Sequence, residues 1–343
     1  MDFKRLKQIY LIFFTCVLAA ACKNEKKVDV SNVQANIKIE RFDKELSALP
    51  PDQVSAKAPQ LKQKYGHFYA DYMESMLGVG PVNDTTYYQQ LRTVLGNKDY
   101  NELAFEVNRK FPDMKPHQEE LTDAFKHIKY YYPKTKIPRV ITFISGFALQ
   151  TPVGNDYIGI GLDMFLGRDS KFYPALVQSI PQYISRRFTP ENITPRIMEG
   201  FIREDLFPDQ DNDRSLLSKM IYNGKILYMM ETVMPEIADS LIIGYSSEQL
   251  DWADTNQPGV WAYFLENDLL YETDYMKIQK YLNDAPFTPG IGEGSNSAPK
   301  LGVYTGWQIV RKYMDRNPEF TLQELMKEND PQKILNGSKY KPR

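Results

Sequence analysis

The chain has 343 residues, of which 42% are hydrophobic, and its 42 basic and 44 acidic side chains leave a net charge of −2. Charges of both signs are mixed along the sequence, so composition indicates neither a nucleic-acid-binding surface nor a polybasic membrane surface. A chain of this length can bury a substantial core within one large domain, and its two cysteines are too few for a disulfide framework.

The first 22 residues have the pattern of a bacterial export signal. A basic start (residues 4–7) precedes an apolar run (residues 9–21) that is too short to remain as a spanning helix. The run ends in three alanines directly before Cys22, an order that resembles a lipobox, in which the thiol is acylated and becomes the first residue of the mature protein. We therefore expect residues 1–21 to be a lipoprotein signal peptide and Cys22 to be the site of lipid attachment, with palmitate as one acyl group.

Residues 22–36 are polar and lack periodicity, which is typical of a flexible tether behind a lipid anchor. A single globular domain is expected from residue 37 to residue 343. In its first part, apolar residues recur every three or four positions, a spacing that predicts amphipathic helices. These helices are expected at residues 56–77, 84–95, 100–111 and 116–132.

A small β-sheet is expected in the middle of the chain, because residues 138–146 and 157–162 are short runs rich in β-branched and aromatic side chains. Residues 285–302 are rich in proline and glycine, which favours a long loop. Helical spacing returns around this loop, at residues 172–187, 191–206, 214–234, 247–256, 260–270, 274–282 and 304–314, with a short helix from residue 322. The predicted fold class is α+β, predominantly α-helical with a small β-sheet.

Few residues offer candidate chemistry. The three histidines, His67, His117 and His127, are too far apart for the HExxH pair of a zinc helix, and we expect them at the surface or at helix ends. Glu199 and Arg203 stand at helical spacing and are interpreted as a surface ion pair.

Three other motifs each lack a residue that their chemistry requires. The acidic run at residues 209–213 lacks the glycine and the glutamate of a calcium loop, and the glycine-rich run at 290–294 follows no strand. Ser145-Gly146 lacks the preceding glycine of a nucleophile elbow. The sequence therefore predicts no catalytic residue, no metal site and no cofactor.

Long blocks of sequence carry a family resemblance. They are KIERFDKEL (38–46), PQYISRRF (181–188), NGKILYMMETVMP (223–235), IGYSSEQLDW (243–252), GVWAYFLENDLLYETD (259–274), LGVYTGWQIVRKYM (301–314) and SKYKP (338–342). The blocks closely resemble the gliding motility lipoprotein family GldB of Bacteroidetes. The resemblance implies a lipid-anchored protein of the cell envelope that faces the periplasm from either membrane and is required for gliding. It also implies protein contacts with a gliding machinery linked to type IX secretion, and no known chemistry.

A second resemblance concerns the fold. A small sheet followed by helices at 191–206 and 214–234 is similar to the element order of zincin (gluzincin) metallopeptidases. If residues 198–202 take the place of HExxH, Met198 and Ile202 stand at the two histidine positions and only Glu199 is kept. Such a degenerate site could not hold zinc, because zinc needs several nitrogen, sulfur or oxygen ligands. A generic helical α+β domain is the alternative.

Two other classes of function stay open. The first is a hydrolase acting on peptide or cell-wall material. Its candidate carboxylates are Glu199, Glu204 and Glu231. The second is a glycan-binding module. Its candidate rings are Trp252, Trp261 and Trp307. We nevertheless interpret residues 302–314 as structural, with Gly302 and Gly306 allowing a neighbouring backbone to come close.

Overall fold

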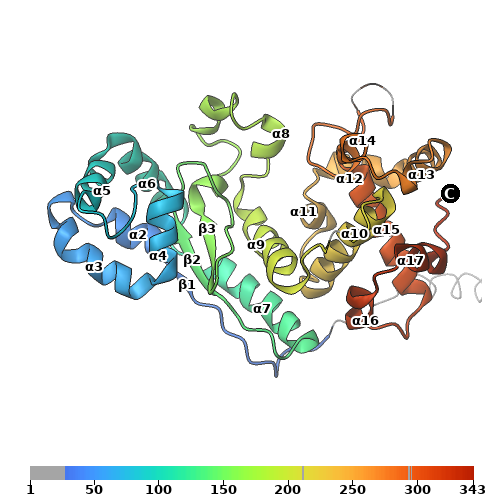
Figure 1. Ribbon diagram of the computed structural model, residues 1–343, viewed down its shortest axis with the longest axis horizontal. Coiled ribbons are helices and arrows are strands. Elements are labelled where there is room, and N and C mark those ends of the chain that lie inside the picture. Colours follow the sequence, from blue (N-terminus) through green and yellow to red (C-terminus); the bar gives the residue numbers. More distant parts are fainter. Residues whose placement is uncertain (1–27, 211, 293, 295) are drawn as a thin grey trace, which may run out of the picture. The chain divides into compact units, whose positions relative to one another are not determined.

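The computed structural model describes residues 28–210, 212–292, 294 and 296–343, so Cys22 and the predicted signal peptide lie outside the described residues (Figure 1). Val33–Arg343 form one compact unit. In the part of the chain that is described, no helix is both long and apolar enough to cross a membrane.

The first half of this unit contains the sheet and six helices. They are β1 (Ile39–Glu40), α2 (Phe42–Ser47), α3 (Val54–Tyr65), α4 (His67–Asp71), α5 (Tyr87–Gly96), α6 (Lys98–Lys110), α7 (Lys115–Tyr131), β2 (Arg139–Phe143) and β3 (Tyr157–Gly161). The second half is helical. Its helices are α8 (Gln182–Ser185), α9 (Ile193–Phe201), α10 (Leu216–Val233), α11 (Asp239–Ile243), α12 (Ser247–Thr255), α13 (Gln257–Glu266), α14 (Tyr275–Ile278), α15 (Leu301–Arg316), α16 (Leu322–Lys327) and α17 (Pro331–Ser338). The predicted α+β class with a small sheet is confirmed.

The sheet has three parallel strands in the order β1-β2-β3, and it is buried on both faces. Because side chains alternate along a strand, Val140 and Ile158 enter the larger core while Ile141 and Phe143 enter a second core with helices α2 to α5. Figure 1 shows these helices on one side of the strands and α9 on the other. Strand β1 was not predicted, because two residues are too few to display an alternating pattern.

Helices α10 and α15 form the centre of the larger core and lie side by side (Figure 1). Gly224 and Gly306 meet at their crossing, where a Cβ on Gly306 would overlap the backbone carbonyl of Met220. A Cβ on Gly302 would lie 2.7 Å from the carbonyl oxygen of Tyr281. Gly302 and Gly306 therefore allow the close backbone approach that the sequence predicts for them.

Several predicted helices differ from the observed ones. The helix predicted at residues 172–187 is instead a 3-10 turn (Tyr173–Leu176) and the single turn of α8, because Pro181 cannot continue a helix that comes before it. The helix predicted at 56–77 is divided at Gly66, whose φ of +56° is left-handed. Helices α2, α11 and α17 were not predicted.

Candidate functional site

Helix α9 carries the residues that sequence reasoning placed at a degenerate zinc site. Met198 and Ile202 are four residues apart and therefore share one face of the helix, and both are fully buried in the larger core. This face packs against the apolar side chains of the larger core. The two positions offer no nitrogen or oxygen to a metal.

Glu199 lies between two arginines on the same stretch of chain. Its carboxylate accepts hydrogen bonds from Arg196 Nη1 at 3.0 Å and from Arg203 Nε at 3.1 Å. The Glu199–Arg203 pair therefore exists, but only 20% of the Glu199 side chain is exposed, so its interpretation as a surface pair is wrong.

The surrounding cations decide the protonation of Glu199. Burial raises its pKa, but the charges of Arg203, Arg196, Lys300 and Arg187 outweigh burial, and the pKa lies well below the ordinary value. A carboxylate that binds a proton so weakly is a poor general base at neutral pH.

A second carboxylate extends this cluster. Asp284 pairs with Lys300 Nζ at 2.8 Å and with Arg187 Nη1 at 3.3 Å. Burial raises the pKa of Asp284, but Lys300 and Arg187 together lower it to about 2.

A cavity of about 300 Å³ opens beside the two carboxylates. It is lined by Glu199, Arg203, Asn223, Leu227, Ile243, Leu282, Asn283, Asp284, Lys300 and Val303. Sequence reasoning missed Arg187, Asp284 and Lys300, since nothing in their local spacing connects them. The available signal was that Arg187 lies inside the block PQYISRRF and Lys300 directly precedes LGVYTGW.

The three candidate carboxylates of a hydrolase do not share one site. Glu231 pairs with Arg311, whose Nε donates to it at 2.8 Å, and burial raises the pKa of Glu231 to about 7 although Arg311 acts to lower it. Asn223, the cluster residue on the same helix, is roughly 12 Å away along the helix axis at 1.5 Å per residue. Glu204 is exposed on the π-helical turn that follows α9.

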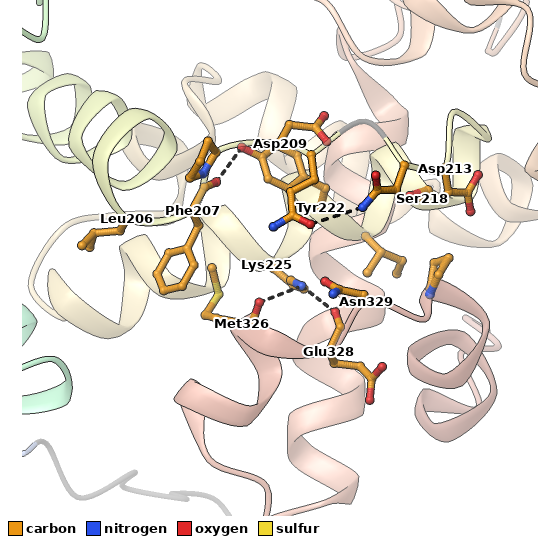
Figure 2. Close-up of a pocket in the computed structure, with 15 residues that line it drawn as sticks. Leu206, Phe207, Asp209, Asp213, Ser218, Tyr222, Lys225, Met326, Glu328 and Asn329 are labelled. Atoms are coloured by element: carbon orange, nitrogen blue, oxygen red, sulfur yellow. Dashed lines mark hydrogen bonds between the residues drawn. The ribbon is translucent and has the colours of Figure 1, made fainter.

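A separate pocket surrounds Lys225 on α10 (Figure 2). Its volume is about 190 Å³. The Lys225 ammonium donates to the carbonyl oxygens of Met326 at 3.2 Å and Glu328 at 2.8 Å. Burial lowers the pKa of Lys225 to about 8. Because its partners are backbone oxygens at the end of α16, Lys225 fastens the C-terminal segment to α10, and we assign it a structural role.

The histidines do not gather near α9's buried face. His67 is exposed at the start of α4, and His117 Nδ1 lies 3.8 Å from Glu120 on its own helix. His127 is buried within α7, where its Nδ1 is 3.0 Å from the carbonyl oxygen of Asp123, so the expectation of a surface or helix-end position is wrong for this residue. Among the described residues, no group of three or more His, Cys, Asp or Glu side chains is arranged to hold a metal ion.

Ser145 belongs to a structural turn after β2. Its hydroxyl donates to Asp163 at 2.9 Å, and the backbone N–H groups of Ser145 and Phe147 donate to the same carboxylate. Asp163 thereby holds a turn in which Gly146 and Phe147 both have left-handed backbone angles. Buried in this way, the serine hydroxyl has no open approach for a substrate.

The tryptophans do not form one exposed platform. Trp307 is fully buried, and the Arg311 guanidinium lies 3.8 Å from the centre of its ring. Trp252 and Trp261 pack partly buried against the larger core, and Trp261 meets the edge of Tyr340. Trp307 is therefore not available to stack on a glycan.

Comparison with protein families gives one result that covers nearly the whole chain. The model described as gliding motility protein GldB matches residues 23–342. Comparison with curated proteins and with solved structures gives no significant match.

Proposed function

Because the chain belongs to the family of the gliding motility protein GldB, we propose that it is a lipid-anchored protein of the cell envelope that supports the gliding machinery through protein contacts. The family match over residues 23–342 is the observation that carries this proposal. It begins one residue after the cysteine at which the sequence pattern places the lipid. We extend the proposal to a machinery linked to type IX secretion on the basis of the sequence blocks.

The geometry of the Glu199 cluster supports a non-enzymatic role. A general base must accept a proton in the reaction, whereas both oxygens of Glu199 already accept hydrogen bonds from arginines. Met198 and Ile202 place apolar groups where a zincin-like helix would need two ligands. The zincin-like element order therefore supports at most a degenerate enzyme fold used as a scaffold.

The anchor is tested by changing the two cysteines separately. Acyl chains contribute about 0.8 kcal/mol per buried methylene, so Cys22→Ala should move the protein from the membrane fraction to the soluble fraction and abolish gliding. Cys16→Ala is the matched control, because it removes the other cysteine and leaves Cys22 in place. Retention of the signal-cleaved Cys22→Ala protein in the membrane fraction would contradict the lipid anchor.

The protein contacts are tested by photo-crosslinking in living cells. Tyr271 and Met276 are large side chains that are 67% and 74% exposed. Tyr271 lies before α14 and Met276 lies within it, so a crosslinking residue at either position should leave the core intact. A second surface is sampled at Phe105 on α6, which is 66% exposed in the other half of the unit. We expect a gliding-machinery protein to be captured at one of these surfaces. Capture of none at any of the three positions would count against the proposal.

A third test separates the scaffold from a hydrolase. Glu199→Gln keeps the shape of the side chain and removes its charge, so a scaffold present at normal amounts should still support gliding. Loss of gliding at an unchanged amount of protein, measured by immunoblot, would favour the hydrolase.

A further inference from the structure

The cavity beside Glu199 is built from segments that are distant in sequence. Glu199 and Arg203 come from α9 and the turn after it, Asn223 from α10, Asp284 from the segment after α14, and Lys300 from the start of α15. Its walls are of two kinds. Charged and amide groups form one part, and the aliphatic side chains of Leu227, Ile243, Leu282 and Val303 form the other.

The charges of the cluster as a whole do not balance. Two cations, Arg203 and Lys300, and two anions, Glu199 and Asp284, line the cavity. Arg187 and Arg196 pair with the same carboxylates without lining the cavity, so the cluster has two positive charges in excess. The side chains of Arg187 and Lys300 are each only 11% exposed. Uncompensated charge in such a place is costly unless something of opposite sign is bound.

The hydrogen bonds show which charge is still open to a ligand. Both oxygens of Glu199 accept from arginines, and the two oxygens of Asp284 face Lys300 and Arg187. Each carboxylate oxygen therefore already faces a cation of the protein, and a cationic ligand would meet these cations as well.

The cations, in contrast, keep unused donors. Lys300 has three N–H groups, and Asp284 is the one acceptor near its Nζ among the described residues. Arg203 donates from Nε to Glu199 and from Nη2 to Asn223. The other N–H groups of its guanidinium remain available to a ligand. The buried Nε of Arg187, a residue that contacts Asp284 but does not line the cavity, also has no hydrogen-bond partner in the described chain.

The backbone is shaped around this cluster. Gly244 has a left-handed φ of +76°, and a Cβ at this position would overlap the guanidinium of Arg187. Lys300 also has a left-handed φ, of +41°, at the start of α15. The arrangement that brings the two cations to Asp284 thus uses backbone conformations that most residues avoid.

We propose that this cavity binds a small organic anion: a carboxylate group held by Lys300 and Arg203, with a short aliphatic part against Leu227 and Val303. The excess positive charge of the cluster and the unused N–H donors favour an anionic ligand. The aliphatic wall favours a ligand with a short apolar part. This inference is independent of the proposed role in gliding.

The test is ligand binding to the purified mature protein in detergent. Butyrate is the probe, butylammonium has the same shape with opposite charge, and sodium chloride at equal ionic strength controls for salt. We expect butyrate to give a saturable heat in calorimetry and to raise the melting temperature with concentration, as a ligand of the folded state must. Butylammonium should do neither.

Variants locate the site. Lys300→Gln should weaken butyrate binding at least tenfold, and Lys312→Gln is its control because Lys312 is exposed on the same helix. Asn283→Asp provides a second route if Lys300→Gln fails to fold, since Asn283 is exposed at the cavity and the change adds a negative charge without altering the core. It should weaken binding several-fold.

Four outcomes would overturn the proposal. They are no saturable butyrate binding, equal stabilisation by butyrate and butylammonium, unchanged affinity in both cavity variants, and binding of inorganic phosphate in place of butyrate.

Discussion

The crossing of α10 and α15 gives the sharpest test of how the core is held together. In Gly306→Ala, the new methyl group would overlap the Met220 carbonyl on α10. Adding a methyl to a packed core ordinarily costs roughly 1–3 kcal/mol, and we expect the upper end or more here because the obstacle is backbone that cannot rotate away. The higher helix propensity of alanine offsets about 1 kcal/mol of this cost. The expected net loss is about 2–4 kcal/mol.

The assay is chemical and thermal unfolding of the purified protein. At roughly 2–4 °C per kcal/mol for domains of this order of size, the melting temperature should fall by about 4–16 °C. Gly259→Ala is the matched control, because Gly259 is exposed in helix α13 and a Cβ there would meet no atom within 4 Å. This control should be neutral or stabilising by up to about 1 kcal/mol.

A double variant tests whether the two glycines act at one contact. Gly224→Ala should destabilise by a similar amount, because its Cβ would overlap the backbone of Gly306. Once one methyl has separated the helices, the second should cost less, so the double variant should lose less than the sum. Unchanged stability of Gly306→Ala, or full additivity, would refute a backbone-to-backbone crossing.

Three further predictions concern buried groups and metal. Trp307→Ala should lower the free energy of unfolding by roughly 3–5 kcal/mol, since the ring is fully buried, and an unaltered denaturation curve would show that the ring does not support the core. The pKa of Glu231 is raised from 4.5 to about 7, so the folded protein holds this proton more tightly than the unfolded chain does. Its contribution should be complete below the unfolded pKa of 4.5 and should disappear by about pH 7, a loss of at most about 3 kcal/mol that Glu231→Gln should remove from the pH profile of stability. Elemental analysis of the purified protein should find no stoichiometric zinc, and a chelator should leave the melting temperature unchanged; one zinc per chain, lost together with a hydrolytic activity, would instead point to an enzyme.

The sequence by itself determined the longer helices, because their periodicity is a local property. The predicted ranges 100–111, 116–132 and 214–234 correspond closely to α6, α7 and α10. The two-residue strand β1 and the five-residue helix α11 are too short for a period to be recognised, and only their packing makes them stable.

The sequence also shows which chemical groups are missing. Ile202 has no lone pair for a metal and Met198 only a weak thioether, and residues 145–146 lack the glycine of a nucleophile elbow, so these observations did not depend on tertiary structure. Burial was harder to foresee. Glu199 and Arg203 have the spacing of an ordinary exposed pair, and only the packing of α9 shows that they are largely buried.

Only the tertiary structure decided the composition of the charged cluster. Glu199 and its arginines are close in sequence, but Asp284 and Lys300 reach them through a loop and the start of α15. Spacing along a chain reports neighbours on one helix or strand, whereas contacts between segments depend on how the whole core packs. The excess of positive charge in this cluster is therefore a property of the fold that no local pattern in the sequence records.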